Sequence, residues 1–347
     1  MRSFWRIAGS TTCGLAILLI GGPSYSSPTS EQEKPPSQAT ESLRLLLKAA
    51  EQGDANAQSL LGVHYIEGKE VQQDNAQAVR WFREAAEQGE ATAQNNLGRM
   101  YSSGRGVQQD YAEAARWTRK AAEQGQASAQ LGLGLMYDKG QGVPQDYAEA
   151  VRWFRIAAQQ GEVDAEYLLG SMYALGQGVP QDYAEAARWL RKAAEQGNAS
   201  AYWGLGSMYE TGRGVPQDYV EAVRWYRKAA AHGDASAQWG LGYMYANGLG
   251  VRQDYAEAAR WTRKAAEQGN AVAQFDLGVM YDKGQGVPQN YVEAHMWLNL
   301  AASRTSGEYQ NKIAGSRDSV AQKMGPDQLA EAQRRAREWK PKTGADQ

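Results

Sequence analysis

Cysteine and histidine are scarce in this sequence. Its 347 residues include one cysteine, Cys13, and three histidines, His64, His232 and His295. Cys13 falls in an N-terminal segment that we expect to be removed, so the mature chain should contain no disulfide and no reactive thiolate. The histidines are far apart in the sequence and show no metal-ligand spacing. We therefore predict no metal site and no cofactor.

Residue groupings that carry enzymatic chemistry are also missing. The S-x-x-K motif of serine acyl-transfer enzymes does not occur. Glycine pairs such as Gly140 and Gly142 resemble a phosphate-binding loop, but they follow a predicted helix and lack the preceding strand and the later glycine. No nucleophile, metal and base constellation is recognisable. The sequence predicts a protein that is not an enzyme.

A strong charge of one sign is absent. The formal net charge is −2. Such a chain offers no general electrostatic attraction to nucleic acid or to anionic lipid. We expect no nucleic-acid partner.

Long apolar runs are absent apart from LAILLI near the N-terminus. Arg2 and Arg6 precede this run and small residues up to Ser26 follow it, which is typical of a secretory signal. The run is shorter than the roughly 20 apolar residues that a membrane span needs. We predict that residues 1–26 are a signal peptide, and an uncleaved N-terminal anchor is the alternative.

The segment that follows is polar and rich in proline. Residues 27–40 read SPTSEQEKPPSQAT, a composition that predicts a flexible linker. With the signal removed, the mature chain would have no membrane span. We expect it to be periplasmic or secreted.

What the sequence has in abundance is a repeat. The glycine of an AAEQG-like phrase recurs every 36 residues. A fixed period of this length is typical of stacked-repeat proteins. Seven units fill residues 53–304, and we predict one extended domain, because such arrays are stabilised by contacts between neighbouring units. The marker glycines are Gly53, Gly89, Gly125, Gly161, Gly197, Gly233 and Gly269.

The first half of each unit predicts an amphipathic helix, which we call the A helix. In the third unit Ala129, Leu133, Met136 and Tyr137 lie at i, i+4, i+7 and i+8. A G-x-G-V phrase follows, and its glycines supply the positive φ angles that end a helix. We expect this A helix to end near residue 139.

The second half of each unit predicts another helix, the B helix. Its opening DYAE phrase places Asp146 at the N-cap and Glu149 three residues later, the spacing of a capping box. Apolar residues then recur at helical spacing until Gly161 ends the helix. Acids of the Asp146 type could also be viewed as catalytic carboxylates, but one acid at each helix start is what capping requires. Each unit is therefore a helix hairpin.

Two columns of residues predict the core. Each A helix contains an interior glycine, such as Gly134, which costs about 1 kcal/mol relative to alanine and so indicates close packing. Each B helix carries a tryptophan, and we expect its ring to fill the space over the glycine. The predicted core tryptophans are Trp81, Trp117, Trp153, Trp189, Trp225, Trp261 and Trp297.

Capping helices are predicted at both ends. Residues 41–52 repeat the B-helix phrase and predict an unpaired N-terminal capping helix. The last B helix reads HMWLNLAA, which has apolar residues where other copies have Arg and Lys. Residues 305–340 predict two helices that would cover it, with Pro326 opening the second. Residues 341–347 are predicted to be a disordered tail.

The repeated unit resembles a known family. The pattern A-x-x-x-L-G-x-M-Y-x-x-G-x-G-V-x-x-D-Y-x-E-A-x-x-W is similar to the Sel-one-like repeat (SLR) family over residues 53–304. The first unit departs from it with Glu70 at the second glycine. The resemblance implies an all-α fold: a right-handed α/α superhelical solenoid of tetratricopeptide-like type, with seven 36-residue helix-hairpin repeats and capping helices. It also implies a scaffold that holds other proteins.

One column of the A helices falls outside the core pattern. Two residues before the repeated leucine, the units change from Ser59 and Asn95 to larger apolar and aromatic residues. On a helical wheel this column points about 160° from the leucine. In the family the A helix lines the inner groove, so the rings would form a ladder on the concave wall. The predicted partner-binding residues are Tyr167, Trp203, Trp239 and Phe275, with Tyr243 on the same face as Trp239.

Two interpretations of this ladder stay open. The rings could pack between adjacent A helices, or they could bind a partner, since Trp and Tyr dominate interface hot spots and exposed apolar strips mark interaction sites. We predict a non-enzymatic scaffold that binds a protein or peptide in the concave groove. The alternative function is binding of cell-wall peptidoglycan, with the rings stacked on sugar faces.

Overall fold

The structure is a computed structural model that describes residues 41–342. The predicted signal peptide, the predicted linker and residues 343–347 lie outside the described residues. The described part forms helices and no strands. The helices are α2 (Glu41–Glu51), α3 (Ala55–Glu67), α4 (Asn75–Glu87), α5 (Ala91–Ser103), α6 (Tyr111–Glu123), α7 (Ala127–Lys139), α8 (Tyr147–Gln159), α9 (Val163–Leu175), α10 (Tyr183–Glu195), α11 (Ala199–Thr211), α12 (Tyr219–Ala231), α13 (Ala235–Asn247), α14 (Tyr255–Glu267), α15 (Ala271–Lys283), α16 (Tyr291–Ser303), α17 (Gly307–Ala321) and α18 (Pro326–Glu338).

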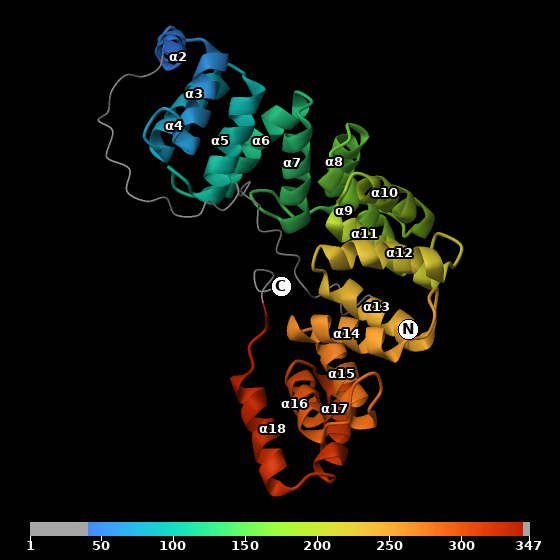
Figure 1. Cartoon of the computed structure of the whole chain (residues 1–347). Helices are drawn as coiled ribbons and strands as arrows, with labels where there is room; N and C mark the ends of the chain where they lie inside the picture. The colour runs from blue at the N-terminus through green and yellow to red at the C-terminus, as the bar shows by residue number, and fades with distance from the viewer. Residues whose placement is uncertain (1–40, 343–347) are drawn as a thin grey trace.

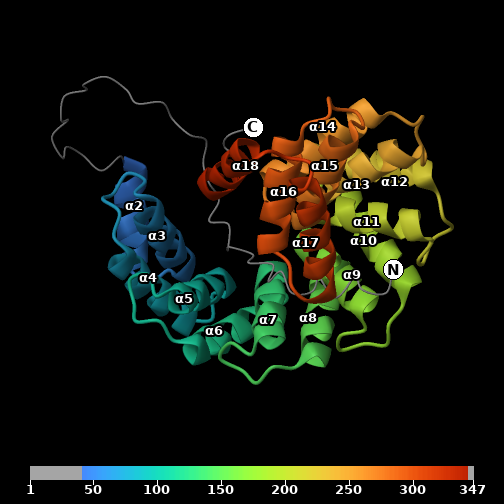
Figure 2. The same cartoon turned by 90° about the horizontal axis from the view of Figure 1, so that it is seen from below.

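The helices follow one another along a curved solenoid. Figures 1 and 2 show the chain running in a broad arc from α2 at one end to α18 at the other. From α2 to α17, each helix packs on the next helix in the chain. The odd-numbered helices α3 to α15 are the A helices, and the even-numbered helices α4 to α16 are the B helices. The predicted all-α solenoid of helix hairpins is confirmed.

Glycine ends each A helix, as the sequence predicts. Helix α7 ends at Lys139, and Gly140 follows in the left-handed region with φ 66°. The next glycine, Gly142, has φ 72°, and a Cβ there would collide with the carbonyl oxygen of Tyr111 in the preceding repeat. Glu70 takes this position in the first repeat with φ 62°. The residue that would correspond to Tyr111 for Glu70 is residue 39, which lies outside the described residues.

Aspartate caps every B helix except α16, which Asn290 caps, and the predicted capping box does not form. Asp146 Oδ1 accepts hydrogen bonds from Ala148 N at 2.9 Å and from Glu149 N at 3.1 Å. The reciprocal bond from the Glu149 side chain is absent, because Asp146 N donates to the Tyr137 carbonyl oxygen at 3.0 Å. Glu149 pairs instead with Arg152, one helical turn along. The Tyr137 carbonyl near the end of the A helix therefore satisfies the amide that a capping box would otherwise satisfy.

The tryptophans of the B helices pack toward the preceding repeat. Trp117 lies in one cluster with Ala85 and Ala86, the small residues near the end of the preceding B helix. Trp153 packs in the same way on Ala121 and Ala122. The paired alanines leave room for an indole ring. Six of the seven tryptophans are buried, and Trp261 is half-buried.

The interior glycine of each A helix meets a different residue from the one that we predicted. A Cβ on Gly134 would lie 2.6 Å from the ring of Phe154, not against Trp153. Phe154 follows the tryptophan in the sequence, and the same position faces the glycine in every repeat. The tryptophan turns to the preceding repeat, and this leaves the next residue to face the A helix of its own repeat. The facing residues are Phe82, Thr118, Phe154, Leu190, Tyr226, Thr262 and Leu298.

A glutamine ladder, which the sequence analysis did not predict, joins successive repeats. Gln130 Nε2 donates to the carbonyl oxygen of Ala122 at 3.2 Å, near the end of the preceding B helix. Gln130 Oε1 accepts from Gln160 Nε2 at 2.7 Å, at the end of its own B helix. One buried amide thus connects three helices and satisfies a helix-end carbonyl. Gln58, Gln94 and Gln274 donate to the equivalent carbonyl groups.

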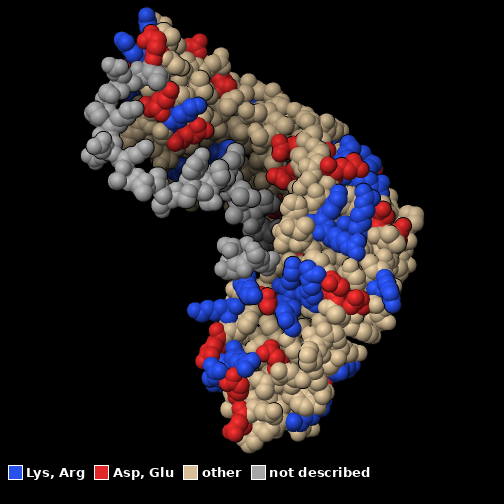
Figure 3. Space-filling model, viewed as in Figure 1, with Lys and Arg blue, Asp and Glu red and all other residues tan. Residues whose placement is uncertain are grey.

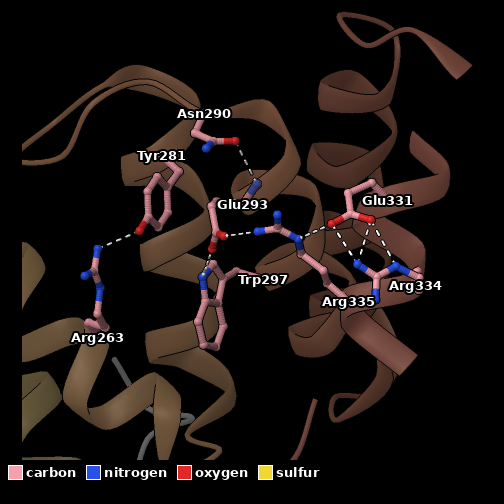
Figure 4. Close-up of polar contacts among 8 residues, drawn as sticks. All are labelled: Arg263, Tyr281, Asn290, Glu293, Trp297, Glu331, Arg334 and Arg335. Carbon is pink, nitrogen blue, oxygen red and sulfur yellow. Dashed lines mark hydrogen bonds and ion pairs between the residues drawn. The ribbon is translucent and has the colours of Figure 1, made fainter. Parts of the chain in front are cut away.

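Both C-terminal helices cover the last B helix, α16. Helices α17 and α18 each pack on α16 and make little contact with each other. Met296 and Leu300 of the apolar HMWLNLAA phrase are buried there, in a cluster with Trp297 and Trp339. Figure 4 shows Glu293 accepting from Trp297 and from Arg335 of α18. Helix α18 thereby supplies an arginine to a B helix that has lost its own.

Candidate partner-binding site

The predicted ladder runs along the A helices, and most of its residues are partly covered. Ser59 and Asn95 are buried, at 6 % and 7 % exposure. The rings that follow are half-buried, and Tyr243 is exposed at 40 %. The half-buried rings are Tyr167 on α9, Trp203 on α11, Trp239 on α13 and Phe275 on α15.

The first part of the ladder packs between repeats. Asn95 Nδ2 donates to Ser128 Oγ of the next repeat at 3.1 Å. Tyr167 and Trp203 pack against the large core cluster that spans helices α9 to α13. Packing between repeats therefore buries part of the surface of these rings, which is what the inter-repeat packing interpretation expects.

The last part of the ladder forms a group of aromatic and polar side chains on α13, α15 and α17. Trp239 Nε1 donates to Asp276 Oδ2 at 2.7 Å. The Trp239 and Tyr243 rings are 6.2 Å apart, and the Phe275 and Tyr309 rings meet edge to face at 6.0 Å. We call these five residues the aromatic cluster. Tyr243 is its most exposed member, so a partner could reach the cluster there.

A pocket of about 650 Å³ opens beside this cluster, between α15 and α17. Phe275 and Asp276 line it on the array side, while Lys312 of α17 lines the other side. Gly315 and Ser316 also line the pocket on α17, and their small size leaves more open space on that side. The pocket thus combines an apolar ring with an acid and a base.

Asp276 is the charged group of this site with the most altered environment. Burial raises the pKa of its carboxyl, and the hydrogen bond from Trp239 and the Lys312 charge act in the opposite direction. The equivalent positions in the two preceding repeats are Gly204 and Gly240. Asp276, Tyr309 and Lys312 were not predicted from the sequence. The only sequence signal was this change from glycine to aspartate.

Within residues 41–342 no group of three or more His, Cys, Asp or Glu residues could hold a metal ion. No helix in the same part of the chain is long and apolar enough to cross a bilayer. The arrangement offers rings, a pocket and a few charges, which suit recognition of another molecule.

Comparison with known proteins identifies the repeat. The family model described as Sel1 repeat matches residues 34–54, 55–90, 91–126, 127–162, 163–198, 199–234, 235–270 and 271–306. The seven matches from 55 onward are complete hairpins, and the match at 34–54 includes α2. A search of curated proteins finds no match.

Solved structures of similar proteins have the same architecture. A Sel1 repeat protein from Oxalobacter formigenes is 39% identical, with a TM-score of 0.62 and coverage of 78% of each chain. A protective antigen of uropathogenic Escherichia coli with an SLR fold is 31% identical, with a TM-score of 0.50. That match covers 85% of this chain and 86% of the antigen.

Proposed function

Because the chain belongs to the Sel1 repeat family, whose members are generally protein-interaction scaffolds, we propose that it binds a protein or peptide partner in the groove of its solenoid, without enzymatic activity. The main contact in this proposal is the aromatic cluster at the C-terminal end of the ladder. The cluster provides rings at its surface and a pocket at its side. This combination is the observation that carries the proposal.

The composition of the cluster suits a peptide. Rings such as Tyr243 and Phe275 supply apolar contact area at a small cost in side-chain entropy. The pocket of about 650 Å³ can take one large side chain or several small ones. Asp276 and Lys312 offer one acceptor and one donor for the polar groups of the ligand. The partner is therefore a segment with an apolar anchor and polar groups beside it.

Selection of peptides on the immobilised protein tests this proposal. We expect a phage-displayed library to yield ligands whose affinity falls about tenfold or more in Tyr243→Ala, because hot-spot rings contribute roughly 2 kcal/mol. Tyr255→Ala is the matched control, since Tyr255 is a tyrosine of equal exposure, 40 %, at the start of α14. Selected peptides should bind this control with unchanged affinity.

Two results would contradict the proposal. Peptides that bind Tyr243→Ala and Phe275→Ala as well as they bind the unchanged protein would place the binding surface elsewhere. Retention on purified peptidoglycan that is lost in Tyr243→Ala, without any peptide ligand, would instead favour the glycan-binding alternative. Circular dichroism of each variant would show that the fold is kept.

Export is the second part of the proposed function. The charged N-terminus and the LAILLI run support removal of residues 1–26 and a periplasmic or secreted location. Intact-mass measurement of protein from the envelope and the medium tests this. A mass that begins at Ser27 would support export with cleavage, whereas a mass that includes the first 26 residues would favour the uncleaved anchor.

A further inference from the structure

A second pocket lies at the C-terminal end of the solenoid, on a different side of α17 from the aromatic cluster. It has a volume of about 440 Å³ and is lined by residues of α16, α17 and α18. The two capping helices each pack on α16 but hardly touch each other. The pocket is the wedge between them, with α16 at its base.

The base of the wedge carries a histidine that the fold does not require. His295 is 4 % exposed, and the equivalent positions of the other B helices carry valine or alanine. These buried apolar residues are Val79, Ala115, Val151, Ala187, Val223 and Ala259. An apolar residue would therefore fill this position without leaving a polar group to satisfy.

No described residue satisfies the His295 ring. Its Nδ1 is sealed from solvent and has no hydrogen-bond partner within residues 41–342. Leaving a buried polar atom unpaired costs free energy. The cost is smallest when Nδ1 is the unprotonated nitrogen, which places the proton on Nε2. His295 lines the pocket, so an Nε2 proton is available to a ligand there.

The walls of the wedge are rich in hydrogen-bond donors. Arg337 of α18 lines the pocket and makes no hydrogen bond or ion pair within the described part of the chain. Arg317 of α17 lines the opposite wall and donates to Asp318 Oδ1 at 2.7 and 2.9 Å, and to Asn299 Oδ1 at 3.4 Å. Two guanidinium groups against one carboxylate leave the pocket with one excess positive charge.

We propose that this wedge binds a small organic carboxylate, held by Arg337 and His295 and placed beside Arg317. A guanidinium group matches the two oxygens of a carboxylate with parallel N–H donors. One negative charge balances the excess charge of the pocket. Ala321 and Leu329 also line the wedge, so they offer an apolar surface to the hydrocarbon part of the ligand.

Binding would be linked to the protonation of His295. Burial lowers the pKa of its imidazole, the Arg317 charge lowers it further, and Asp318 acts in the opposite direction. From α18, Arg337 adds positive charge at the pocket. A bound carboxylate supplies negative charge and so raises the His295 pKa. Affinity for the carboxylate should therefore increase as the pH falls through that pKa.

Titration of the full chain with acetate and with butyrate tests the proposal. Imidazole NMR follows the three histidines, and the His295 signal is assigned by its loss in His295→Val, a variant that restores the residue of Val151 and Val223. We expect a saturable shift of the His295 signal and a rise of its pKa. Butyrate should bind more tightly than acetate because of its apolar tail.

Two arginine variants on α18 make the result specific. Arg337→Gln should weaken binding about tenfold, the effect of losing one charge-assisted hydrogen-bonding group. Arg334→Gln is the control, because Arg334 pairs only with Glu331 and Glu338 on its own helix, and it should bind as before. A His295 signal that does not respond to either acid, or that responds equally in Arg337→Gln, would overturn the proposal. A response to inorganic phosphate alone would overturn the choice of a carboxylate.

Discussion

At the scale of single residues, the array tolerates replacements where a neighbour can adapt. The glutamine ladder shows this at two positions. In the fifth repeat Tyr202 and His232 replace both glutamines, and their rings lie 5.7 Å apart. In the fourth repeat Glu166 has the shape of glutamine and accepts from Gln196 Nε2 at 2.7 Å. An ionised Glu166, however, has no proton to donate to the preceding B helix.

This difference predicts that Glu166→Gln stabilises the protein at neutral pH. Burial raises the pKa of the Glu166 carboxyl, against the opposing effects of Lys192 and Gln196. A carboxyl with a raised folded-state pKa stabilises the fold at low pH, and that contribution is lost as the pH rises from about 4.3, the unfolded value. We expect a gain of about 1 kcal/mol at pH 7, since the amide regains one hydrogen bond, and almost none at pH 4. Urea unfolding at both pH values measures it; an equal gain at both would contradict the pKa argument.

The core tryptophans give a second prediction at this scale. Trp153 is 9 % exposed, whereas Trp261 is half-buried under Arg260 and Lys264, which lie 5.7 and 4.9 Å from its ring centre. Trp153→Ala should lower the free energy of unfolding by about 3 to 5 kcal/mol, because it removes a large ring and leaves a cavity. Trp261→Ala should cost less, since less apolar area is lost. Chemical denaturation compares them, and equal losses would show that exposure does not set the cost.

At the scale of helices and turns, the GxGV turn fixes how one repeat meets the next. Its second glycine has a positive φ and also touches the start of the preceding B helix. We expect Gly142→Ala to destabilise the protein by more than the roughly 1 to 2 kcal/mol of left-handed strain alone, because the new Cβ would meet the Tyr111 carbonyl. Glu70→Gly is the opposite case and should be neutral or stabilising, because Glu70 already has φ 62°. Thermal unfolding of both variants decides this, and a harmless Gly142→Ala would mean that the turn can move away.

The elements themselves could be predicted from the sequence because their signals are local. The glycine after Lys139 and the aspartate before α8 act within a few residues of the helix ends that they fix. Which residue packs against the interior glycine could not be predicted. Trp153 and Phe154 both lie on the apolar side of one helix, and only the way in which the two helices cross determines which of them meets the glycine. The ladder bonds of Gln130 reach 8 residues back and 30 forward. Such contacts arise from the stacking of repeats, and the position of the glutamine in the sequence does not show which groups it will meet.

The candidate site was predictable only in part, for the same reason. The aromatic column stands out because one position changes between otherwise similar repeats. How far each ring is covered depends on the next A helix, and the pocket beside Phe275 depends on the path of α17. Helix α17 follows the last matched repeat, which ends at 306. The repeat pattern therefore carries no information on that wall of the pocket.

At the scale of the whole molecule, the solenoid depends on contacts between neighbours, and the C-terminal end is closed by α18. Figure 3 shows a hollow between the two halves of the arc. Because each repeat is held by its neighbours in the chain, stability should be local along the array. At its end, α18 pairs Arg335 with Glu293 at 2.8 Å and places Trp339 on Trp297 at 6.2 Å between ring centres. Beyond the helix, Lys342 N donates to the Glu267 carbonyl oxygen at 2.8 Å.

Deletion of residues 325–347 should therefore loosen the end of the array and leave its beginning unchanged. Without α18 the apolar residues Met296 and Leu300 meet water, and Glu293 loses its partner Arg335. We expect faster amide hydrogen exchange in α15 and α16, measured by mass spectrometry of peptides, and no change in α3 to α6. Trp339→Ala should produce a smaller effect in the same helices, because it removes one ring but keeps the ion pair. If protection fell equally along all seven hairpins, the array would unfold as one cooperative unit, and a local role for the cap would be wrong.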